Sequence, residues 1–484
     1  MPIDYFFRSL GEAREEQAIC IVLSGTATDG TLGLRAVKSH GGLGIVQDPA
    51  TASHDGMPQS AISTGMVDLV LPVEEMPEAI VKYTQHPFIR DVKKTAPIPE
   101  QAQDDFQNIL ALLRNRAGHD FKWYKKTTLV RRIQRRIGLN HLDNYPQYLD
   151  HLRNHPKEVN QLFKELLISV TDWFRDPPAW EELKEHVLPK IFGQQGESSQ
   201  PLRIWVAGCA TGEEAYSLAI LLTEEAEERQ VAPNFLIFAT DVNRDSLEFA
   251  RNGVYPDAIA DEVSQERLAR FFIREGQYLR VKKSLREAIV FAQQNLISDP
   301  PFSRLDLITC RNLLIYLEPE IQRKIISLFH FSLKQHGFLF LGNSESVTQQ
   351  KNLFDPLSKK WRLYRKIGVA QTALELPVSQ DRFEEQKPLG YARPPARRPR
   401  VSELAQEVLL ERFVPAAVLV DNSYQILYYH GPHENYLVQP PGEPTTDLVN
   451  IAREGLRARL RGALHSAAKN REDYSFSDGR GKRG

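Results

Sequence analysis

One short segment combines residue types that could hold a small ligand. Residues 204–215 read Ile-Trp-Val-Ala-Gly-Cys-Ala-Thr-Gly-Glu-Glu-Ala, an apolar run followed by small residues and a helix start. Small residues let the backbone approach a ligand closely, and the first turn of a helix offers N–H groups without intrahelical partners. The sequence therefore predicts a ligand site directly after a buried strand.

The acids at this helix start bear on the kind of ligand. Ala210 stands where a dinucleotide-binding turn has its second glycine, and Glu213 and Glu214 begin the helix. Carboxylates at this place repel a pyrophosphate, so a cationic ligand without phosphate, such as S-adenosylmethionine, fits better. The alternative is a helix whose first turn is acidic only because the helix dipole favours it.

A second candidate residue follows the next expected strand. Asp241 comes just after the apolar run 235–239. A carboxylate at the tip of the second strand commonly binds ribose hydroxyls in sheets of this type, although aspartate also caps helices. Together with the small-residue turn, Asp241 favours a nucleoside ligand.

A third segment suggests a different chemistry. Asp299-Pro-Pro-Phe302 resembles the active-site tetrapeptide of methyltransferases that act on amino groups of adenine or glutamine. That tetrapeptide follows the fourth strand of its fold, whereas here the expected fourth strand, residues 305–309, comes after it. We therefore interpret residues 299–302 as a turn and expect no nucleic-acid substrate.

Composition excludes several classes of protein. The 484 residues include 61 Lys and Arg against 62 Asp and Glu, so the chain is not a basic nucleic-acid coat. Its apolar runs are far shorter than the roughly 20 residues of a membrane span, and no signal peptide is visible. Cys20, Cys209 and Cys310 lie far apart. We expect no membrane insertion, no disulfide, no metal site, and a cytoplasmic location.

Two polar breaks divide the chain. The second holds five prolines and an arginine cluster, which indicates an extended linker. The predicted organisation is a partial α/β domain at 1–90, a linker at 91–104, a helical domain at 105–175, an α/β domain at 176–367, a linker at 368–401 and a partial domain at 402–484.

Hydrophobic periodicity predicts the elements that position these residues. Helices are expected at 106–117, around 129–137, at 146–155 and at 159–168. Strands at 202–206, 235–239, 305–309 and 338–341 then alternate with helices at 215–224, 244–251 and 318–334. This order predicts a doubly wound α/β domain preceded by a helical cap. Strands are also expected at 18–23, 43–47 and 67–71, a helix at 403–412, and a hairpin formed by 417–420 and 424–429.

The central part resembles the CheR-type chemotaxis receptor methyltransferases, which methylate receptor glutamates with S-adenosylmethionine. The resemblance runs from about residue 106 to 361. It rests on Ser-Val-Thr-Asp-Trp-Phe-Arg at 169–175, GCATGEEAYS at 208–217, ATDVN at 239–243, QNL at 294–296 and CRNLLIY at 310–316. It implies the S-adenosylmethionine-dependent methyltransferase fold with a small β insertion.

The resemblance also implies roles for individual residues. Arg175 and Tyr316 match positions that align the methyl donor and the substrate carboxylate. The family more often has Asn where Ser169 stands. The residues implied to surround the cofactor are Ser169, Thr171, Arg175, Glu214, Asp241, Asn295, Leu296, Arg311 and Asn312.

A basic segment suggests how a partner is recognised. Between Lys122 and Arg136 there are seven basic residues and no acid. In the family the corresponding helix docks on the acidic, glutamate-bearing helices of the chemoreceptor cytoplasmic domain; the alternative is a solvated helix face. The predicted β insertion near 253–286 is compact, so we expect recognition that does not need a receptor tether.

The flanking parts resemble two other families. LSGTATDG at 23–30 and HDGMPQSAI at 54–62 resemble the C-terminal part of the CheB-type protein-glutamate methylesterase, in which Asp29 matches the triad acid. The serine and histidine of that triad normally lie upstream of this point, so we expect no esterase activity. Residues 402–476 resemble the beginning of a PAS domain, an α+β fold.

Three hypotheses follow from these patterns. The first is a protein-glutamate O-methyltransferase joined to parts of an esterase and a PAS domain. The second is a signalling scaffold that binds S-adenosylmethionine with little turnover. The third is a nucleic-acid methylase. It relies on residues 299–302, which come before the expected fourth strand, whereas the tetrapeptide of that class follows the fourth strand.

Overall fold

The computed structural model describes residues 1–90, 102–167, 171–195, 200–347 and 352–368, together with parts of 417–470. The chain forms two compact units, residues 1–383 and 384–484. Among the helices that these ranges contain, none is both long and apolar enough to cross a membrane. Ser169, both expected linkers in large part and the expected helix at 403–412 lie outside the described residues.

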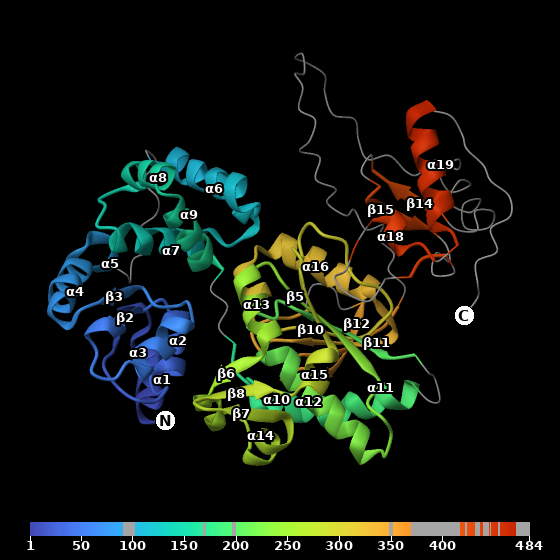
Figure 1. Cartoon of the computed structure of the whole chain (residues 1–484), viewed down its shortest axis with the longest axis horizontal. Coiled ribbons are helices and arrows are strands. Elements are labelled where there is room, and N and C mark those ends of the chain that lie inside the picture. Colours follow the sequence, from blue (N-terminus) through green and yellow to red (C-terminus); the bar gives the residue numbers. More distant parts are fainter. Residues whose placement is uncertain are drawn as a thin grey trace. The chain divides into compact units, whose positions relative to one another are not determined.

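A seven-stranded sheet is the centre of the first unit (Figure 1). Its order is β12-β13-β11-β10-β4-β5-β9, and β13 runs antiparallel to β11 whereas β11, β10, β4, β5 and β9 are parallel. The strands are β4 (Leu202–Ala207), β5 (Phe235–Asp241), β9 (Ile289–Gln293), β10 (Leu305–Cys310), β11 (Leu333–Leu341), β12 (Phe354–Ser358) and β13 (Leu363–Lys366). The chain therefore has the predicted α/β architecture of a methyltransferase.

Both faces of this sheet are buried, which explains why its strands are apolar without alternation. Ile204 and Val206 of β4 pack into one core, while Trp205 and Ala207 pack into another on the opposite face. The helices of the first core are α10 (Pro177–His186), α11 (Leu188–Gln195), α12 (Glu213–Glu228), α13 (Arg244–Asn252), α14 (Gln265–Phe271) and α15 (Lys283–Glu287). Helix α16 (Pro319–Ser332) belongs to the second core.

The predicted helical cap contributes to that second core. It consists of α6 (Gln103–Ala117), α7 (Lys126–Leu139), α8 (Tyr145–Asn154) and α9 (Pro156–Leu166). Phe106, Ile133, Tyr148 and Leu162 are fully buried and share the core with Trp205. The predicted apolar stripe of α7 at Leu129, Ile133 and Ile137 therefore does face the interior.

The N-terminal residues form a small parallel sheet, as the strand–helix–strand pattern predicts. Its strands are β1 (Ile19–Val22), β2 (Leu43–Gln47) and β3 (Leu69–Leu71), in that order. The accompanying helices are α1 (Pro2–Arg14), α2 (Thr31–Ser39), α3 (Gly56–Ser63), α4 (Met76–Gln85) and α5 (Pro87–Arg90). Residues 1–90 are called the esterase-like segment below.

Two smaller elements match their predictions. The β insertion is a three-stranded sheet of β6 (Val254–Pro256), β8 (Tyr278–Val281) and β7 (Phe272–Glu275). In the second unit, β14 (Ala417–Val420) and β15 (Ile426–His430) form the predicted antiparallel hairpin, followed by α18 (Leu448–Ile451) and α19 (Arg457–Asn470).

Candidate functional site

A cavity opens beyond the carboxyl ends of β4, β5 and β10. Because the carboxyl ends of parallel strands meet at one edge of a sheet, residues that are distant in sequence converge there. Seven residues that the sequence predicts for the site line this cavity: Thr171, Arg175, Glu214, Asp241, Arg311, Asn312 and Tyr316.

The turn between β4 and α12 forms the floor of the cavity. Gly208 has a φ of 76°, and a Cβ at this position would meet Leu313 at 2.8 Å, so glycine is required. Ala210 also has a positive φ, and its N–H donates to Oδ2 of Asp241 at 2.9 Å. Asp241 therefore holds the turn in place.

Asp241 is a buried carboxylate bound mainly by backbone. Its Oδ1 accepts from the N–H of Asn243 at 2.8 Å, and burial raises the pKa of its carboxyl. Each carboxylate oxygen keeps a second lone pair. Asp241 can thus accept hydrogen bonds from ribose hydroxyls while it caps the turn, so the binding and capping interpretations are compatible.

The two acids at the start of α12 have different surroundings. Glu214 lines the cavity, and its Oε1 accepts from the Thr309 hydroxyl at 2.5 Å. Burial raises the pKa of Glu214, while Arg311 and Thr309 act in the opposite direction. Glu213 instead accepts a hydrogen bond from Arg35 of the esterase-like segment at 2.9 Å. Of the two, Glu214 is the one that lines the cavity and favours a cationic ligand.

Arg311 shapes the wall that carries Arg175. Its Nη1 donates to the Arg175 carbonyl and its Nη2 to Oδ2 of Asp176, both at 2.9 Å. The guanidinium also lies over the ring of Phe340, 4.6 Å from its centre. Arg311 thereby fixes the backbone at residues 175–176, in addition to lining the cavity.

Asn312 provides a test of whether the cavity suits S-adenosylmethionine. Its φ is 59°, and Glu345 holds its backbone N–H at 3.1 Å and that of Leu314 at 2.6 Å. Its Oδ1 is buried without a hydrogen-bond partner, which normally indicates a missing ligand or water. An amide oxygen, the Glu214 carboxylate and the Asp241 carboxylate around one cavity fit a ligand with a cationic centre, an amino group and a ribose.

The helical cap supplies residues that sequence reasoning missed. Tyr124 and Arg132 line the cavity together with the residues at the strand ends. The Arg132 guanidinium lies over the Tyr316 ring, 5.6 Å from its centre, and donates to the Glu165 carbonyl. The only signal in the sequence was the basic character of the segment, which does not distinguish a cavity residue from a surface one.

The remaining predicted cofactor residues lie elsewhere. Asn295 donates from Nδ2 toward Nδ1 of buried His119 at 3.4 Å, and its Oδ1 accepts from Ile297 N–H at 3.0 Å. Leu296 packs against the core shared by the sheet and the helical cap. Neither residue is among those that line the cavity described above, and Ser169 lies outside the described residues.

Residues 299–302 form an irregular connection before β10, directly after a turn at residues 296–298, so the predicted turn lies slightly earlier in the chain. Phe302 stacks on Phe238 with ring centres 4.5 Å apart and meets Trp205 edge-on at 5.3 Å. Phe302 is therefore a partly buried residue that packs against the core of the sheet.

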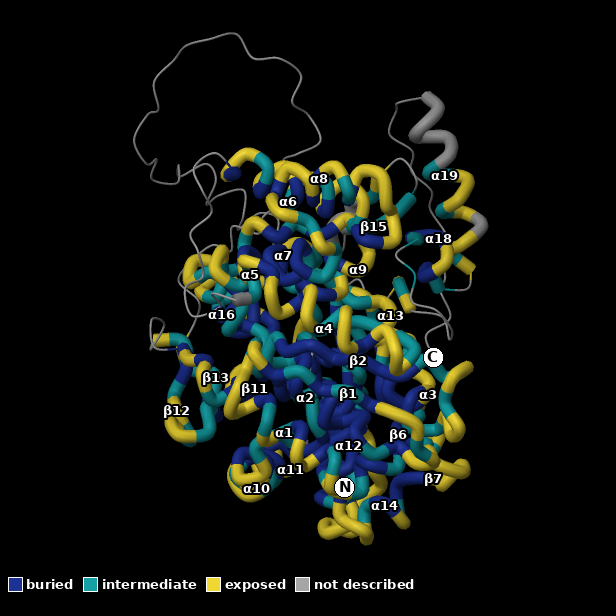
Figure 2. The backbone as a smooth tube through the Cα atoms, turned by 90° about the vertical axis from the view of Figure 1, so that its left-hand side faces the viewer, coloured by how far each residue is buried: buried dark blue, intermediate teal, exposed yellow. Residues whose placement is uncertain are grey.

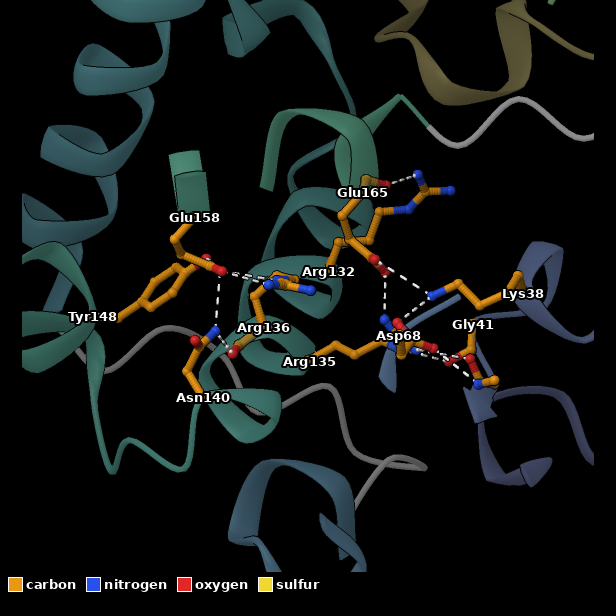
Figure 3. Close-up of polar contacts among 12 residues, drawn as sticks. Lys38, Gly41, Asp68, Arg132, Arg135, Arg136, Asn140, Tyr148, Glu158 and Glu165 are labelled. Atoms are coloured by element: carbon orange, nitrogen blue, oxygen red, sulfur yellow. Dashed lines mark hydrogen bonds and ion pairs between the residues drawn. The ribbon is translucent and has the colours of Figure 1, made fainter. Parts of the chain in front are cut away.

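Most arginines of the basic segment are engaged within the chain, as Figure 3 shows. Arg135 donates to Oδ2 of Asp68 at 2.6 Å and to Oε1 of Glu165 at 2.9 Å. Arg136 donates to Oε1 of Glu158 at 2.9 Å. The interpretation of this segment as a uniformly solvated face is thus wrong for its C-terminal half, because the esterase-like segment and α9 cover it. Lys122 and Lys126 remain exposed.

Asp29, the residue matched to the triad acid, binds the backbone of the N-terminal helix. Its carboxylate accepts from the backbone N–H groups of Ile3 at 3.2 Å and Asp4 at 3.0 Å. These are donors in the first turn of α1 that lack intrahelical partners. Asp29 therefore caps α1.

The strand order, the small-residue turn and the polar cavity define an S-adenosylmethionine-dependent methyltransferase. Residues 169–363 match the family described as CheR methyltransferase, SAM binding domain, residues 104–167 match its all-alpha domain, and residues 1–80 match CheB methylesterase. The chain belongs to the chemotaxis protein methyltransferase (CheR) family, with part of a CheB-type domain joined before it.

Curated relatives agree with this assignment. Chemotaxis protein methyltransferase 1 of Pseudomonas aeruginosa is 33% identical over 47% of this chain and 83% of its own length. An uncharacterized 104.1 kDa protein from the hypE 3' region of Rhodobacter capsulatus is 35% identical over 98% of this chain. The chain spans about half of the length of that Rhodobacter protein, namely 52%.

Two solved structures show similarity to parts of the chain. The catalytic domain of the Thermotoga maritima CheB methylesterase is 36% identical over 16% of this chain and 41% of that chain, with a TM-score of 0.16. PKMT2 of Rickettsia typhi in complex with AdoHcy is 14% identical over 36% of this chain and 26% of that chain, with a TM-score of 0.21.

Proposed function

We propose that the chain transfers a methyl group from S-adenosylmethionine to glutamate carboxylates on the cytoplasmic helices of chemoreceptors. The observation that carries the proposal is the convergence of Arg175, Tyr316, Glu214, Asp241 and Asn312 on one cavity. Bound S-adenosylmethionine supplies an electrophilic methyl group. We place the reaction in the cytoplasm because the proposed substrate helices lie there.

The residues of the cavity suit a carboxylate substrate. A glutamate side chain is already ionised at neutral pH, so no general base is needed and alignment is the main requirement. Arg175 brings a positively charged side chain and Tyr316 a hydroxyl to the lining of the cavity. We propose that these two residues orient the substrate carboxylate, while Glu214, Asp241 and Asn312 hold the cofactor.

For the receptor, we propose docking on the basic segment Lys122–Arg136, mainly through its exposed residues. Lys122, Lys126 and Arg131 are exposed, whereas Arg132 and Arg135 are buried. The β7–β8 connection is short, with Gly276 and Gln277 between the strands, and we propose that docking needs no receptor tether. We further propose that the esterase-like segment has no esterase activity, because its triad acid is used as a helix cap.

The test is incubation of the full chain with methyl-labelled cofactor and receptor cytoplasmic fragments. We expect label on the receptor that is released by base, as for a carboxyl ester, and none on fragments whose acceptor glutamates are replaced by glutamine. A chain that binds cofactor but transfers no label would instead support a signalling scaffold. Label that is stable to base would contradict carboxyl methylation.

A further inference from the structure

Arg35 of the esterase-like segment contacts two chain segments at the cofactor cavity. Its Nη2 donates to the carbonyl of Thr171 at 3.0 Å, to Oε1 of Glu213 at 2.9 Å and to the Thr211 hydroxyl at 3.3 Å. Thr171 lines the cavity, Thr211 belongs to the turn between β4 and α12, and Glu213 is the first residue of α12. One side chain therefore links the segment at Thr171 to the turn after β4 and the start of α12.

Arg35 and Glu213 form a buried pair of opposite charges. The side chains of Arg35 and Glu213 are 9% and 1% exposed. The second oxygen of Glu213 accepts from the Thr211 hydroxyl at 2.6 Å. A buried carboxylate that loses its cationic partner is strongly destabilised, so the turn depends on Arg35 both for its hydrogen bonds and for its charge balance.

The position of Arg35 is fixed by the packing of the helix that carries it. It lies on α2, whose Leu34 and Val37 are fully buried in the esterase-like segment. One turn further along the same helix, Lys38 binds Asp68 at 2.7 Å and Glu165 of the helical cap at 3.5 Å. Arg35 and Lys38 thus lie on one face of α2, which contacts the methyltransferase fold, while the opposite face is held by its own core.

We propose that Arg35 is a positioning residue for the S-adenosylmethionine site, supplied by the esterase-like segment. It acts through Thr171 and Glu213 by holding the segment that carries Arg175 against the turn that binds the cofactor. The inference rests on the proposed function for the identity of the ligand. It gives the segment a role in methyl transfer that is independent of ester hydrolysis.

The experiment is titration of the full chain with S-adenosylhomocysteine, followed by calorimetry. We expect Arg35→Met to weaken binding at least tenfold and Arg35→Lys to recover part of the loss, because lysine keeps a charged donor there. Lys38→Met is the matched control: it removes a charge from the same face of α2 but no contact to the turn, so binding should stay within twofold. Equal weakening by both methionine variants would overturn the proposal.

A double variant separates positioning from loss of folding. Arg35→Met leaves Glu213 buried and unpaired, so Arg35→Met/Glu213→Gln should recover thermal stability. The Thr171 carbonyl still lacks its donor in the double variant, and S-adenosylhomocysteine binding should remain weak. Full recovery of binding would show a purely structural role and overturn the proposal. The binding titration contains no receptor and so does not depend on methyl transfer. If the original chain and the variants bind S-adenosylhomocysteine as expected, but the original chain transfers no methyl group to receptor fragments, only the proposed function is contradicted.

Discussion

Arg135 and Asp68 join the basic helix α7 to the esterase-like segment. Nη2 of Arg135 lies 2.6 Å from Oδ2 of Asp68, and the side chains are only 6% and 3% exposed. Lys38 and Glu165 complete a buried cluster of two cations and two carboxylates. Figure 2 shows the dark, buried backbone that surrounds β1, β2 and α2. Arg135 of the basic helix α7 therefore has a structural role, because this buried cluster holds it.

Removing Asp68 should destabilise the fold. Burial alone would raise the pKa of Asp68, but Arg135 and Lys38 hold it below its usual range, so the carboxylate is charged in the cluster. Asp68→Asn leaves two buried cations facing Glu165 alone, and we expect a loss of about 3–5 kcal/mol in the free energy of unfolding. Urea denaturation at low and high salt measures it, and the loss should depend little on salt because the cluster is buried.

A surface pair provides the control for this prediction. Asp150 binds Arg153 at 2.9 Å with side chains 68% and 56% exposed. Asp150→Asn should change the free energy of unfolding by less than about 1 kcal/mol. Similar losses for Asp68→Asn and Asp150→Asn would show that the buried cluster is not a stabilising contact.

The exposed lysines of the basic segment should affect receptor recognition and leave stability unchanged. We expect Lys122→Glu/Lys126→Glu to lower the rate of receptor methylation at low salt by about tenfold and to flatten its salt dependence, because screening then has less attraction to remove. Initial rates across a salt series measure this. Lys283→Glu, a change of an exposed lysine on α15, should leave the salt series unchanged. An unaltered series for the double variant would contradict docking on this segment.

The basic segment shows what could and could not be predicted from sequence. The short run at β2 (Leu43–Gln47), which is buried at every residue, and the apolar stripe of α7 were predicted correctly, because both patterns are local in the sequence. The convergence of Glu214, Asp241 and Asn312 followed from strand-end positions in a parallel sheet. The burial of Arg135, by contrast, depends on a carboxylate 67 residues away in the chain, and no local pattern indicates such a partner. Arg35 was missed for the same reason.

Arg175 and Asp241 should affect different steps of methyl transfer. Arg175→Ala removes a charge from the cavity wall, and we expect methyl transfer to be abolished while S-adenosylhomocysteine binding stays within a few fold. Asp241→Ala removes the contacts to Ala210 and Asn243, so we expect it to abolish both binding and transfer. Calorimetry and a receptor methylation assay compare the two. Retained transfer in both variants would contradict the proposed site.

Asp29 should contribute to stability without any hydrolytic role. Because it caps α1 through Ile3 and Asp4, Asp29→Ala should cost about 1 kcal/mol in the free energy of unfolding. Asp29→Asn keeps an acceptor oxygen and should retain most of that stability. Neither the original chain nor the variants should hydrolyse methyl-glutamate esters on receptor fragments. Hydrolysis that is lost in Asp29→Ala would show that the residue still acts in an esterase site.

His119 should make the folded state sensitive to acid. Burial lowers the pKa of its imidazole from 6.5 to about 4. Its Nδ1 faces the Asn295 amide nitrogen, a donor, so Nδ1 accepts and Nε2 carries the proton toward the Tyr124 oxygen at 3.1 Å. Below pH 6.5 the unfolded chain takes up a proton that the folded chain excludes. The contribution of His119 is therefore complete above pH 6.5 and is lost as pH falls toward 4, by about 3 kcal/mol in all.

The measurement is urea unfolding of the original chain and of His119→Gln between pH 4.5 and 7.5. We expect the difference in free energy between the two to shrink as pH falls, because glutamine has no proton to exclude. A difference in stability that stays constant with pH would show that His119 takes up its proton equally in the folded and unfolded chains.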